Sequence, residues 1–293
     1  MFKNYLKIAF RNFKKQKVYS LINIIGLAMG MAAFILIALW VQYELSYDRY
    51  HENAEQIYRV TCEDRARTYM NSYHHAQAHQ GAALALKNDI PEVIAATRFW
   101  RFNKVRLAVG ENHFIEDNFI AADQEFFDVF KFPLIKGDPE TALDDPFSII
   151  LSESMAQKYF REGDPINQVI RYEDEHDLKV TGVFQDVPKN SHFSADFIGA
   201  LGFRNIISGR DVTKDFDYFC YTYFLARQNA DMAELNRQLD MLPEKHFYTS
   251  QEMREHRQIK YHLQPLTKIH LHSHLNFELS NNIIAVAREK MGK

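Results

Sequence analysis

The chain has 293 residues, of which 46% are hydrophobic and 25% charged, and its formal net charge at pH 7 is −3. With 14% aromatic residues, 8 Pro and 11 Gly, this composition excludes a long disordered protein. All charged residues among the first seventeen are basic, so the remainder of the chain is distinctly acidic. A nucleic-acid partner is therefore not expected.

Residues 1–17 predict a basic amphipathic helix. From Phe2 onward, apolar side chains recur at i, i+3, i+4, i+7, i+8 and i+11, which collects them on one helical face. The basic residues are Lys3, Lys7, Arg11, Lys14, Lys15 and Lys17. Such a helix is expected to lie on an acidic membrane surface, where apolar burial and lipid attraction both favour it. Alternatively, the basic residues only orient the span that follows.

Residues 18–43 contain no charged side chain and predict a transmembrane helix. At 1.5 Å per residue the stretch is roughly 39 Å long, enough to cross a hydrocarbon core of about 30 Å. The positive-inside rule then predicts a cytoplasmic N-terminus and an exported remainder. A cleaved secretory signal is the alternative, but its apolar region is usually about 7–15 residues long and ends at a small-x-small site. This stretch is longer and ends in Leu39-Trp40-Val41.

Gly26 and Gly30 lie four residues apart within the predicted span, and Ala28 and Ala32 repeat the spacing. Small residues on one stripe allow a second helix to approach closely in lipid, so the sequence predicts a helix-packing surface at the two glycines. Against this, Gly is frequent in membrane helices in general.

Beyond the span, the pattern of apolar residues predicts a mixed α+β domain in which strands outnumber helices. One expected helix is capped by Ser152, and a later one has Met232, Leu235, Leu239 and Leu242 on one face. The other expected helices cover residues 44–56 and 73–87, and the capped one covers residues 152–160. The expected strands cover residues 57–61, 97–102, 105–109, 113–121, 147–151, 169–172, 178–184 and 218–226, the last of them a central strand.

The chain contains two cysteines, Cys62 and Cys220, and both lie in strand-like segments. Free cysteines in such segments are usually small buried core residues, which is our expectation here. A disulfide between them in an oxidising compartment is the alternative.

Two groups of histidines have spacings that can bind a metal. His75 and His79 are one helical turn apart, and His270, His272 and His274 alternate as on one face of a strand. Neither group has an acidic or cysteine partner at motif spacing, so we expect surface or interface histidines and no metal site.

Catalytic motifs are missing from the sequence. It contains no G-x-S-x-G elbow, phosphate-binding glycine loop or H-E-x-x-H motif, and Ser152-Glu153-Ser154 has the position of a helix start. We therefore expect neither enzymatic activity nor a bound cofactor.

Short motifs along the chain, taken together, are specific to one family. They are residues 2–12 (FKNYLKIAFRN), 19–30 (YSLINIIGLAMG), 44–51 (ELSYDRYH), 57–60 (IYRV), 126–130 (FFDVF), 133–139 (PLIKGDP), 151–156 (LSESMA), 180–184 (VTGVF) and 265–273 (PLTKIHLHS). In these motifs the chain resembles the MacB/FtsX-like permeases of ABC transporters over nearly its whole length.

The resemblance implies a non-catalytic membrane subunit that couples cytoplasmic ATP hydrolysis to the export or extraction of periplasmic cargo. Its implied partners are the membrane, a second permease in a dimer, a periplasmic partner protein and, for the full-length family member, a cytoplasmic ABC ATPase subunit. It also implies an inner-membrane protein with a two-lobed periplasmic core domain at residues 44–279. The membrane-proximal lobe would comprise residues 44–100 and 215–279, and the inserted lobe residues 100–215.

The chain departs from the family pattern at two places. Asn167 stands where the family usually has glycine, a mild change because asparagine tolerates a left-handed backbone. After residue 279 the family continues into further spans, whereas residues 280–293 form a divergent tail whose apolar run at 283–287 is too short to cross a bilayer. We therefore expect a truncated form of such a permease. The alternative is a self-standing single-span periplasmic sensor or adaptor that binds a peptide, lipid or protein.

Overall fold

The computed structural model describes residues 4–5, 11, 15–64, 74–209, 219–248 and 259–279. The chain divides into two units, of which one ends at Ser46 and the other begins at Tyr47. The first unit contains one long apolar helix, and the second is a domain rich in β-strands. Most of the predicted amphipathic helix at residues 1–17, and all of the tail at residues 280–293, lie outside the described residues.

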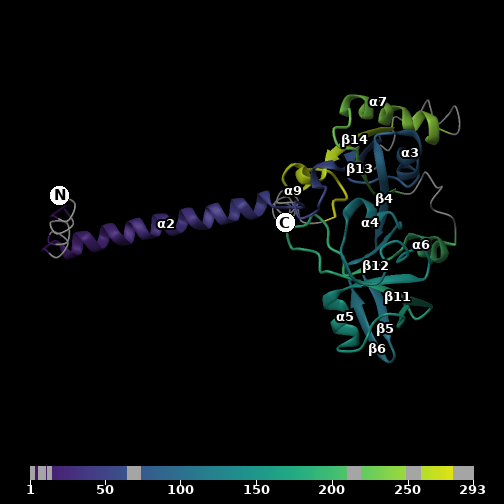
Figure 1. Ribbon diagram of the computed structural model, residues 1–293, viewed down its shortest axis with the longest axis horizontal. Coiled ribbons are helices and arrows are strands. Elements are labelled where there is room, and N and C mark those ends of the chain that lie inside the picture. The colour runs from purple at the N-terminus through teal and green to yellow at the C-terminus, as the bar shows by residue number, and fades with distance from the viewer. Residues whose placement is uncertain are drawn as a thin grey trace, which may run out of the picture. The chain divides into compact units, whose positions relative to one another are not determined.

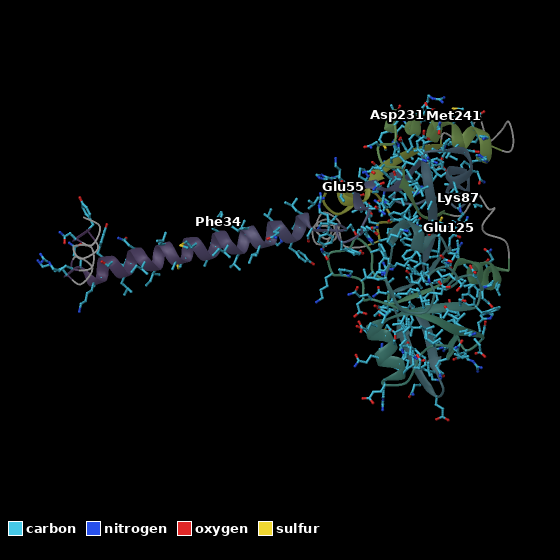
Figure 2. All side chains as sticks on the ribbon, viewed as in Figure 1. Phe34, Glu55, Lys87, Glu125, Asp231 and Met241 are labelled. Carbon is cyan, nitrogen blue, oxygen red and sulfur yellow. The ribbon has the colours of Figure 1, made fainter. Side chains whose placement is uncertain are left out.

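The predicted membrane span is helix α2 (Lys17–Leu45). Its side chains are exposed within the chain; Phe34, for example, is 73% exposed and projects from the helix (Figure 2). Among the described residues, α2 is the one helix that is long and apolar enough to cross a membrane. The structure therefore confirms a continuous apolar helix over the predicted residues.

The domain that begins at Tyr47 is mixed α+β, as predicted, and its described strands outnumber its described helices. The described helices of the domain are α3 (Ala82–Asp89), α4 (Phe126–Phe130), α5 (Glu153–Phe160), α6 (Leu201–Ser208), α7 (Met232–Leu242) and α9 (Ile269–His272), with the short turns η1 (Ala54–Gln56), η4 (Pro243–Phe247) and η5 (Leu266–Lys268).

A continuous sheet runs through the described part of the domain in the order β14-β1-β13-β4-β7-β12-β9-β11-β10-β5-β6 (Figure 1). These strands are β1 (Ile57–Asp64), β4 (Val93–Arg101), β5 (Val105–Val109), β6 (Asn112–Glu116), β7 (Phe119–Ala122), β9 (Ser148–Ser152), β10 (Val169–Tyr172), β11 (His176–Phe184), β12 (Phe197–Ala200), β13 (Phe219–Ala226) and β14 (Ile259–Pro265). The first strand is antiparallel to both of its neighbours, β13 and β14. Two adjacent pairs in the middle, β7 with β12 and β9 with β11, are parallel.

Three short strands pair outside this path: β2 (His74–His75) with β1, β3 (Ala78–His79) with β13, and β8 (Leu134–Lys136) with β11. Helices α3 and α7 pack near the end of the sheet that contains β14, whereas α5 lies at the end that contains β5 and β6 (Figure 1).

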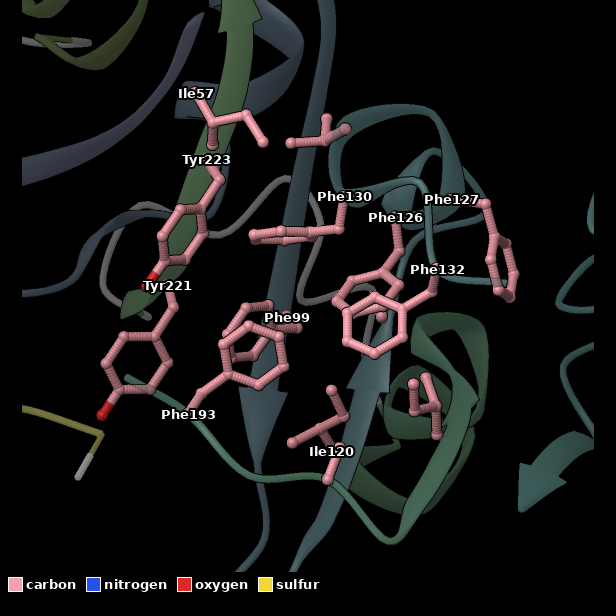
Figure 3. Packing of buried hydrophobic residues seen from close by; sticks show 14 of the residues in the cluster. Ile57, Phe99, Ile120, Phe126, Phe127, Phe130, Phe132, Phe193, Tyr221 and Tyr223 are labelled. Atoms are coloured by element: carbon pink, nitrogen blue, oxygen red, sulfur yellow. The ribbon is translucent and has the colours of Figure 1, made fainter. Parts of the chain in front are cut away.

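The middle of the domain is filled by aromatic rings. Phe99 of β4 and Tyr223 of β13 stack with their ring centroids 5.5 Å apart and their planes 4° apart. Phe126 and Phe130 of α4, together with Phe193, complete the cluster (Figure 3). Offset-stacked and edge-to-face ring pairs of this kind add to the free energy gained by burial. Tyr223 belongs both to this aromatic core and to the candidate site described below.

Several predicted elements are confirmed closely. The predictions for residues 105–109 and 169–172 coincide with β5 and β10. Ser152 caps α5, because its hydroxyl accepts a hydrogen bond from the Met155 N–H at 3.3 Å. Strand β13 is central, with β1 on one side and β4 on the other. In α7, Leu235, Leu239 and Leu242 are buried as predicted.

The predicted helix at residues 44–56 is wrong. Helix α2 ends at Leu45, a turn follows, and Asp48 adopts a left-handed backbone with φ 59°. A left-handed residue cannot continue a right-handed helix. The turn is stabilised by contacts of Asp48 with residues 190–192, which lie too far away in the sequence to be predicted.

The predicted helix at residues 73–87 is wrong in its first half, and the predicted strand at residues 113–121 is interrupted. The helix begins only at Ala82, because β2 and β3 pair with β1 and β13 instead. The predicted strand is two strands, β6 and β7, separated at Asn118. The Asn118 carbonyl accepts a hydrogen bond from the Asp196 N–H at 2.9 Å.

Candidate functional site

Two segments of the domain are joined by buried polar contacts. The early segment, residues 47–51, follows α2 in the chain, and the late segment, residues 273–279, follows α9. The early segment contacts α9, the helix before the late segment: the ring of Tyr47 stacks on the ring of His270 with centroids 3.4 Å apart and planes 2° apart. Parallel ring contact of this kind is favourable and excludes water from the faces that touch. Residues far apart in the sequence thus form one site.

Asp48 fixes the early segment to the loop before β12. Its N–H donates to the Asn190 carbonyl at 2.8 Å. Its Oδ1 accepts hydrogen bonds from the His192 backbone N–H at 3.0 Å and from His192 Nδ1 at 2.8 Å. Burial alone would raise the pKa of this carboxyl, but the contacts with His192 outweigh burial and lower it. Asp48 is therefore a buried carboxylate that depends on His192 for its charge.

The contacts continue from His192 into the centre of the sheet. His192 Nε2 lies 2.7 Å from the hydroxyl of Tyr223, which is fully buried in β13. Burial raises the pKa of Tyr223, and the neighbouring Arg59 charge opposes that rise. Asp48, His192, Tyr223 and Arg59 thus form a continuous buried series, which we call the polar network. A network in a low-dielectric interior is rigid when its members satisfy one another.

Arg59 connects the polar network to the late segment. Its guanidinium is fully buried and donates to both carboxylate oxygens of Glu278, at 2.7 and 2.9 Å. It also donates to Gln264 Oε1 at 2.6 Å and to Ser273 Oγ at 3.0 Å. Burial alone would lower the pKa of Arg59, but Tyr223 and Glu278 outweigh burial and raise it. The paired, hydrogen-bonded geometry is what a buried ion pair requires.

Three further hydrogen bonds hold the late segment on the sheet. The Tyr221 hydroxyl donates to the Phe277 carbonyl at 2.8 Å, and Arg101 donates to the Leu279 carbonyl at 3.0 Å. The Ala76 N–H donates to the Asn276 carbonyl at 2.9 Å. Phe277 itself has a left-handed backbone with φ 58°. A strained residue of this kind persists where its surroundings determine the conformation.

The polar network is unsuited to nucleophilic chemistry. Asp48, His192 and Tyr223 have the order of a carboxylate–imidazole–hydroxyl relay, but Tyr223 is fully buried among aromatic rings, so substrate has no access to it. Its raised pKa also makes the phenol a poorer source of a nucleophilic oxygen. The geometry instead ties the early segment to the late segment.

The structure corrects the expectation of surface histidines, because His75, His79 and His270 are buried. His75 and His79 lie on two different short strands rather than on one helix, and His79 Nδ1 bonds the Tyr261 hydroxyl at 2.6 Å. His270 and His272 lie in α9, so the alternating histidines do not form one face of a strand. Within the described ranges there is no group of three or more His, Cys, Asp or Glu side chains that could hold a metal ion.

Cys62 and Cys220 are both buried, and no disulfide joins them. The expectation of buried core residues is confirmed, and the alternative of a disulfide is not seen. Burial raises the pKa of the Cys220 thiol to about 11, so it is protonated and unreactive at neutral pH.

The residues predicted to contact the membrane and a partner helix lie outside the polar network. Arg11, Lys15 and Lys17 are exposed, while Lys3, Lys7 and Lys14 lie outside the described residues. A Cβ added at Gly26 or Gly30 would meet no atom within 4 Å, so both glycines leave open space on α2. Their roles at a membrane surface and a helix interface stay predictions.

The polar network is not predicted by any motif in the sequence. One signal was available: Arg59 interrupts the apolar run of β1, and a charge on a buried strand needs a partner. The partner, Glu278, is 219 residues away, and no pattern in the sequence pairs the two. The Asp48–His192 contact joins residues 144 positions apart in the sequence, and no pattern in the sequence predicts it either.

The comparisons identify the family. The sequence model of the MacB-like periplasmic core domain matches residues 20–242, and the chain belongs to this family. The resemblance stated from the motifs is therefore confirmed. Membership indicates the periplasmic domain of an ABC transporter permease, and with the single candidate span among the described residues it fits a single-pass inner-membrane topology. A search of curated proteins returned no match.

Three solved structures are similar to the chain. A domain of a protein described as a permease from Porphyromonas gingivalis is 22% identical with a TM-score of 0.62, and the match covers 81% of this chain and 98% of that one. The periplasmic region of MacB from Actinobacillus actinomycetemcomitans is 14% identical with a TM-score of 0.49, covering 72% and 90%. The extracellular domain of the noncanonic ABC-type transporter YknZ from Gram-positive bacteria is 13% identical with a TM-score of 0.47, covering 70% and 99%. The first of these supports the fold.

Proposed function

We propose that this chain is a non-catalytic permease subunit that couples ATP hydrolysis in the cytoplasm to the export or extraction of periplasmic cargo. It works as a dimer with a second permease, binds a cytoplasmic ABC ATPase subunit and contacts a periplasmic partner protein. Family membership supports this assignment. The basic residues before α2 place the N-terminus in the cytoplasm, where they contact acidic lipid, and Gly26 and Gly30 pack against another membrane helix. The domain works as two lobes, residues 100–215 forming the inserted one.

The observation that carries this proposal is the polar network between the early and late segments. The early segment is five residues long and begins at Tyr47, two residues after the end of α2, so movement of that helix pulls on this segment first. Asp48, His192, Tyr223 and Arg59 pass such a displacement through the sheet to Glu278. Packed interiors have low compressibility and transmit strain rather than absorb it. The domain can therefore move as a body when the membrane helices move.

Tyr223→Phe tests the coupling, because it removes only the hydroxyl that His192 contacts. A spin label attached through Ile115→Cys, at an exposed position of β6, reports the distance between two copies in the dimer. The native thiols are buried and do not compete for the label. In the complex with its co-purified ATPase, we expect ATP and vanadate to change this distance. We expect a smaller change in the Tyr223→Phe variant, while its ATP hydrolysis continues.

Tyr172→Phe is the matched control, because it removes the hydroxyl of another buried tyrosine that lies outside the polar network. We expect the same change in spin-label distance in this variant as in the chain without the tyrosine substitution. An unchanged distance response in Tyr223→Phe would refute transmission through the polar network. If the purified chain associates with no ATPase but still binds a ligand saturably, it is a sensor or adaptor, and the permease proposal fails.

A further inference from the structure

The polar network continues along β1 into a cluster of titratable side chains. Thr61 and Glu63 lie on the same face of β1 as Arg59, because side chains alternate along a strand. His262 of β14 lies opposite Thr61, and His74 of β2 lies opposite Glu63 on the other edge of β1. Residues opposite each other in a sheet have their side chains on one face. We call Thr61, Glu63, His74 and His262 the histidine cluster.

Short contacts hold the histidine cluster together. His74 Nε2 lies 2.8 Å from the Thr61 hydroxyl oxygen, and His262 Nε2 lies 3.1 Å from a carboxylate oxygen of Glu63. The two imidazole rings lie against each other, with centroids 4.7 Å apart and planes at 42°. Two positive rings at this separation repel each other, so the cluster resists a proton on both histidines.

His74 is neutral in the cluster at neutral pH. Burial lowers its pKa, positive charge on His262 and on Arg59 lowers it further, and the carboxylate of Glu63 opposes these effects. Lys260, opposite Glu63 on β14, is exposed to water, where its charge is screened. A His74 side chain that has left the cluster has the ordinary pKa of about 6.5. Below about pH 6.5 the released side chain therefore binds a proton that the paired one does not, so the free energy needed for release falls.

Strand β2 connects the histidine cluster to the late segment. The His74 carbonyl accepts a hydrogen bond from the Asn276 N–H at 3.4 Å, and the Asn276 carbonyl accepts one from the Ala76 N–H at 2.9 Å. His75 forms a parallel bridge with Asn276. Because β2 is two residues long, few hydrogen bonds hold it, and its local opening costs less free energy than unfolding of the domain. Release of His74 therefore also frees Asn276.

We propose that the histidine cluster is a pH-sensitive switch: acid around the domain releases β2 from β1 and Asn276 from β2. The end of the late segment stays on the sheet, because Arg59 still binds Glu278 and Arg101 still binds the Leu279 carbonyl. The domain thus loses one attachment of the late segment without unfolding. This inference does not rest on the proposed function, because every contact that it uses lies within one chain.

Hydrogen–deuterium exchange on the full chain in detergent tests the switch at about pH 7 and about pH 5, both above the ordinary glutamate pKa. Protection factors correct for the pH dependence of the intrinsic exchange rate. We expect the protection of the Ala76 and Asn276 amides to fall about tenfold at the lower pH. At both pH values these amides should be less protected than those of β4, which open only with the whole domain. Unchanged protection at the lower pH, or protection as high as that of β4, would overturn the proposal.

His74→Gln and His274→Gln form a matched pair of variants. His74→Gln has no group that takes up the proton, so the protection of the Ala76 and Asn276 amides should be the same at both pH values. His274 is an exposed residue of the late segment outside the histidine cluster, and its replacement should leave the fall in protection unchanged. Circular dichroism confirms that both variants fold. Full pH dependence in His74→Gln, or its loss in His274→Gln, would overturn the role of His74.

Two further variants should act in opposite directions. His262→Gln removes a positive neighbour of His74, so the fall in protection should become smaller. Glu63→Gln removes the carboxylate that favours the proton on His74, so the fall should become larger. A purely structural role of the histidine cluster predicts the same effect for both variants, and that outcome would overturn the proposal.

Discussion

Asp48 and Arg59 show how far single residues can be interpreted without a structure. Each is a charged residue that is fully buried, and each is stabilised there by a partner that is distant in the sequence. The need for a partner follows from the charge and the apolar neighbours of Arg59. The identity of the partner does not, because it depends on which strands the fold places side by side.

His51 makes the stability of the domain depend on pH. Its pKa is about 4 in the folded chain and near 6.5 when the chain is unfolded. Between these values the unfolded state binds a proton that the folded state does not, so stability falls as pH is lowered from about 6.5 to about 4. The full effect is roughly 3 kcal/mol. Urea unfolding at about pH 7 and about pH 5, both above the ordinary aspartate pKa, measures about 2 kcal/mol of this effect.

The His51→Asn variant cannot take up this proton, so its unfolding free energy should change less between the two pH values. His113→Asn removes an exposed histidine instead and should leave the pH dependence of the parent chain unchanged. A His51→Asn variant that keeps the full pH dependence would contradict the assignment to His51.

At the scale of elements, helix caps and apolar helix faces were predicted correctly, because neighbouring residues in the sequence determine them. Ser152 caps α5 and three leucines bury one face of α7, and both follow from residues within one or two helical turns. The predicted elements were wrong where backbone from a distant part of the sequence forms hydrogen bonds with the segment. Residues 73–87 are alanine-rich as a whole and favour a helix, yet backbone groups in their first half pair with β1 and β13. Propensity is a weak preference that tertiary pairing overrides.

The turn after β8 depends on Gly137. Its φ is +93°, and a Cβ there would overlap the Thr181 carbonyl oxygen and lie 2.8 Å from the Cα of Gly182 in β11. Because β11 is a paired internal strand, its backbone cannot move away. We expect Gly137→Ala to lower the free energy of unfolding by about 3 kcal/mol, from backbone strain and overlap together. Urea denaturation measures the loss.

Gly110→Ala is the control for strain alone. Gly110 has φ +58°, but an added Cβ there meets no atom within 4 Å. Its substitution should cost about 1 kcal/mol, the penalty of a left-handed alanine. Equal losses for the two variants would show that contact with β11 is not what restricts Gly137.

For the whole molecule, the family motifs predicted the class of protein correctly, and the pattern of apolar residues predicted the α+β composition correctly. Strand order was out of reach, because β1 pairs with strands that begin more than 150 residues later. The polar network depends on that order: Arg59 reaches Gln264 and Glu278 only because β14 lies next to β1. Topology had to be known before the candidate site could be seen.

Arg59→Gln should destabilise the whole domain, because it leaves the Glu278 carboxylate buried without its cation. Breaking a buried pair from one side costs about 3–5 kcal/mol. We expect a lower unfolding midpoint and faster hydrogen–deuterium exchange across the late segment. Arg171→Gln breaks an exposed pair with Asp177 and should leave both measurements unchanged. Unaltered exchange in Arg59→Gln would mean that the other hydrogen bonds suffice to hold the late segment.

The place of β1 between β13 and β14 also affects how the protein is made. A ribosome must synthesise the chain as far as Pro265 before the first strand has both of its neighbours. At about 5–20 residues per second, the roughly 200 residues in between take on the order of 10–40 s. Throughout that interval the nascent β1 lacks its β14 partner, and an unpaired strand edge invites aggregation. A holding chaperone is therefore expected to accompany the growing polypeptide.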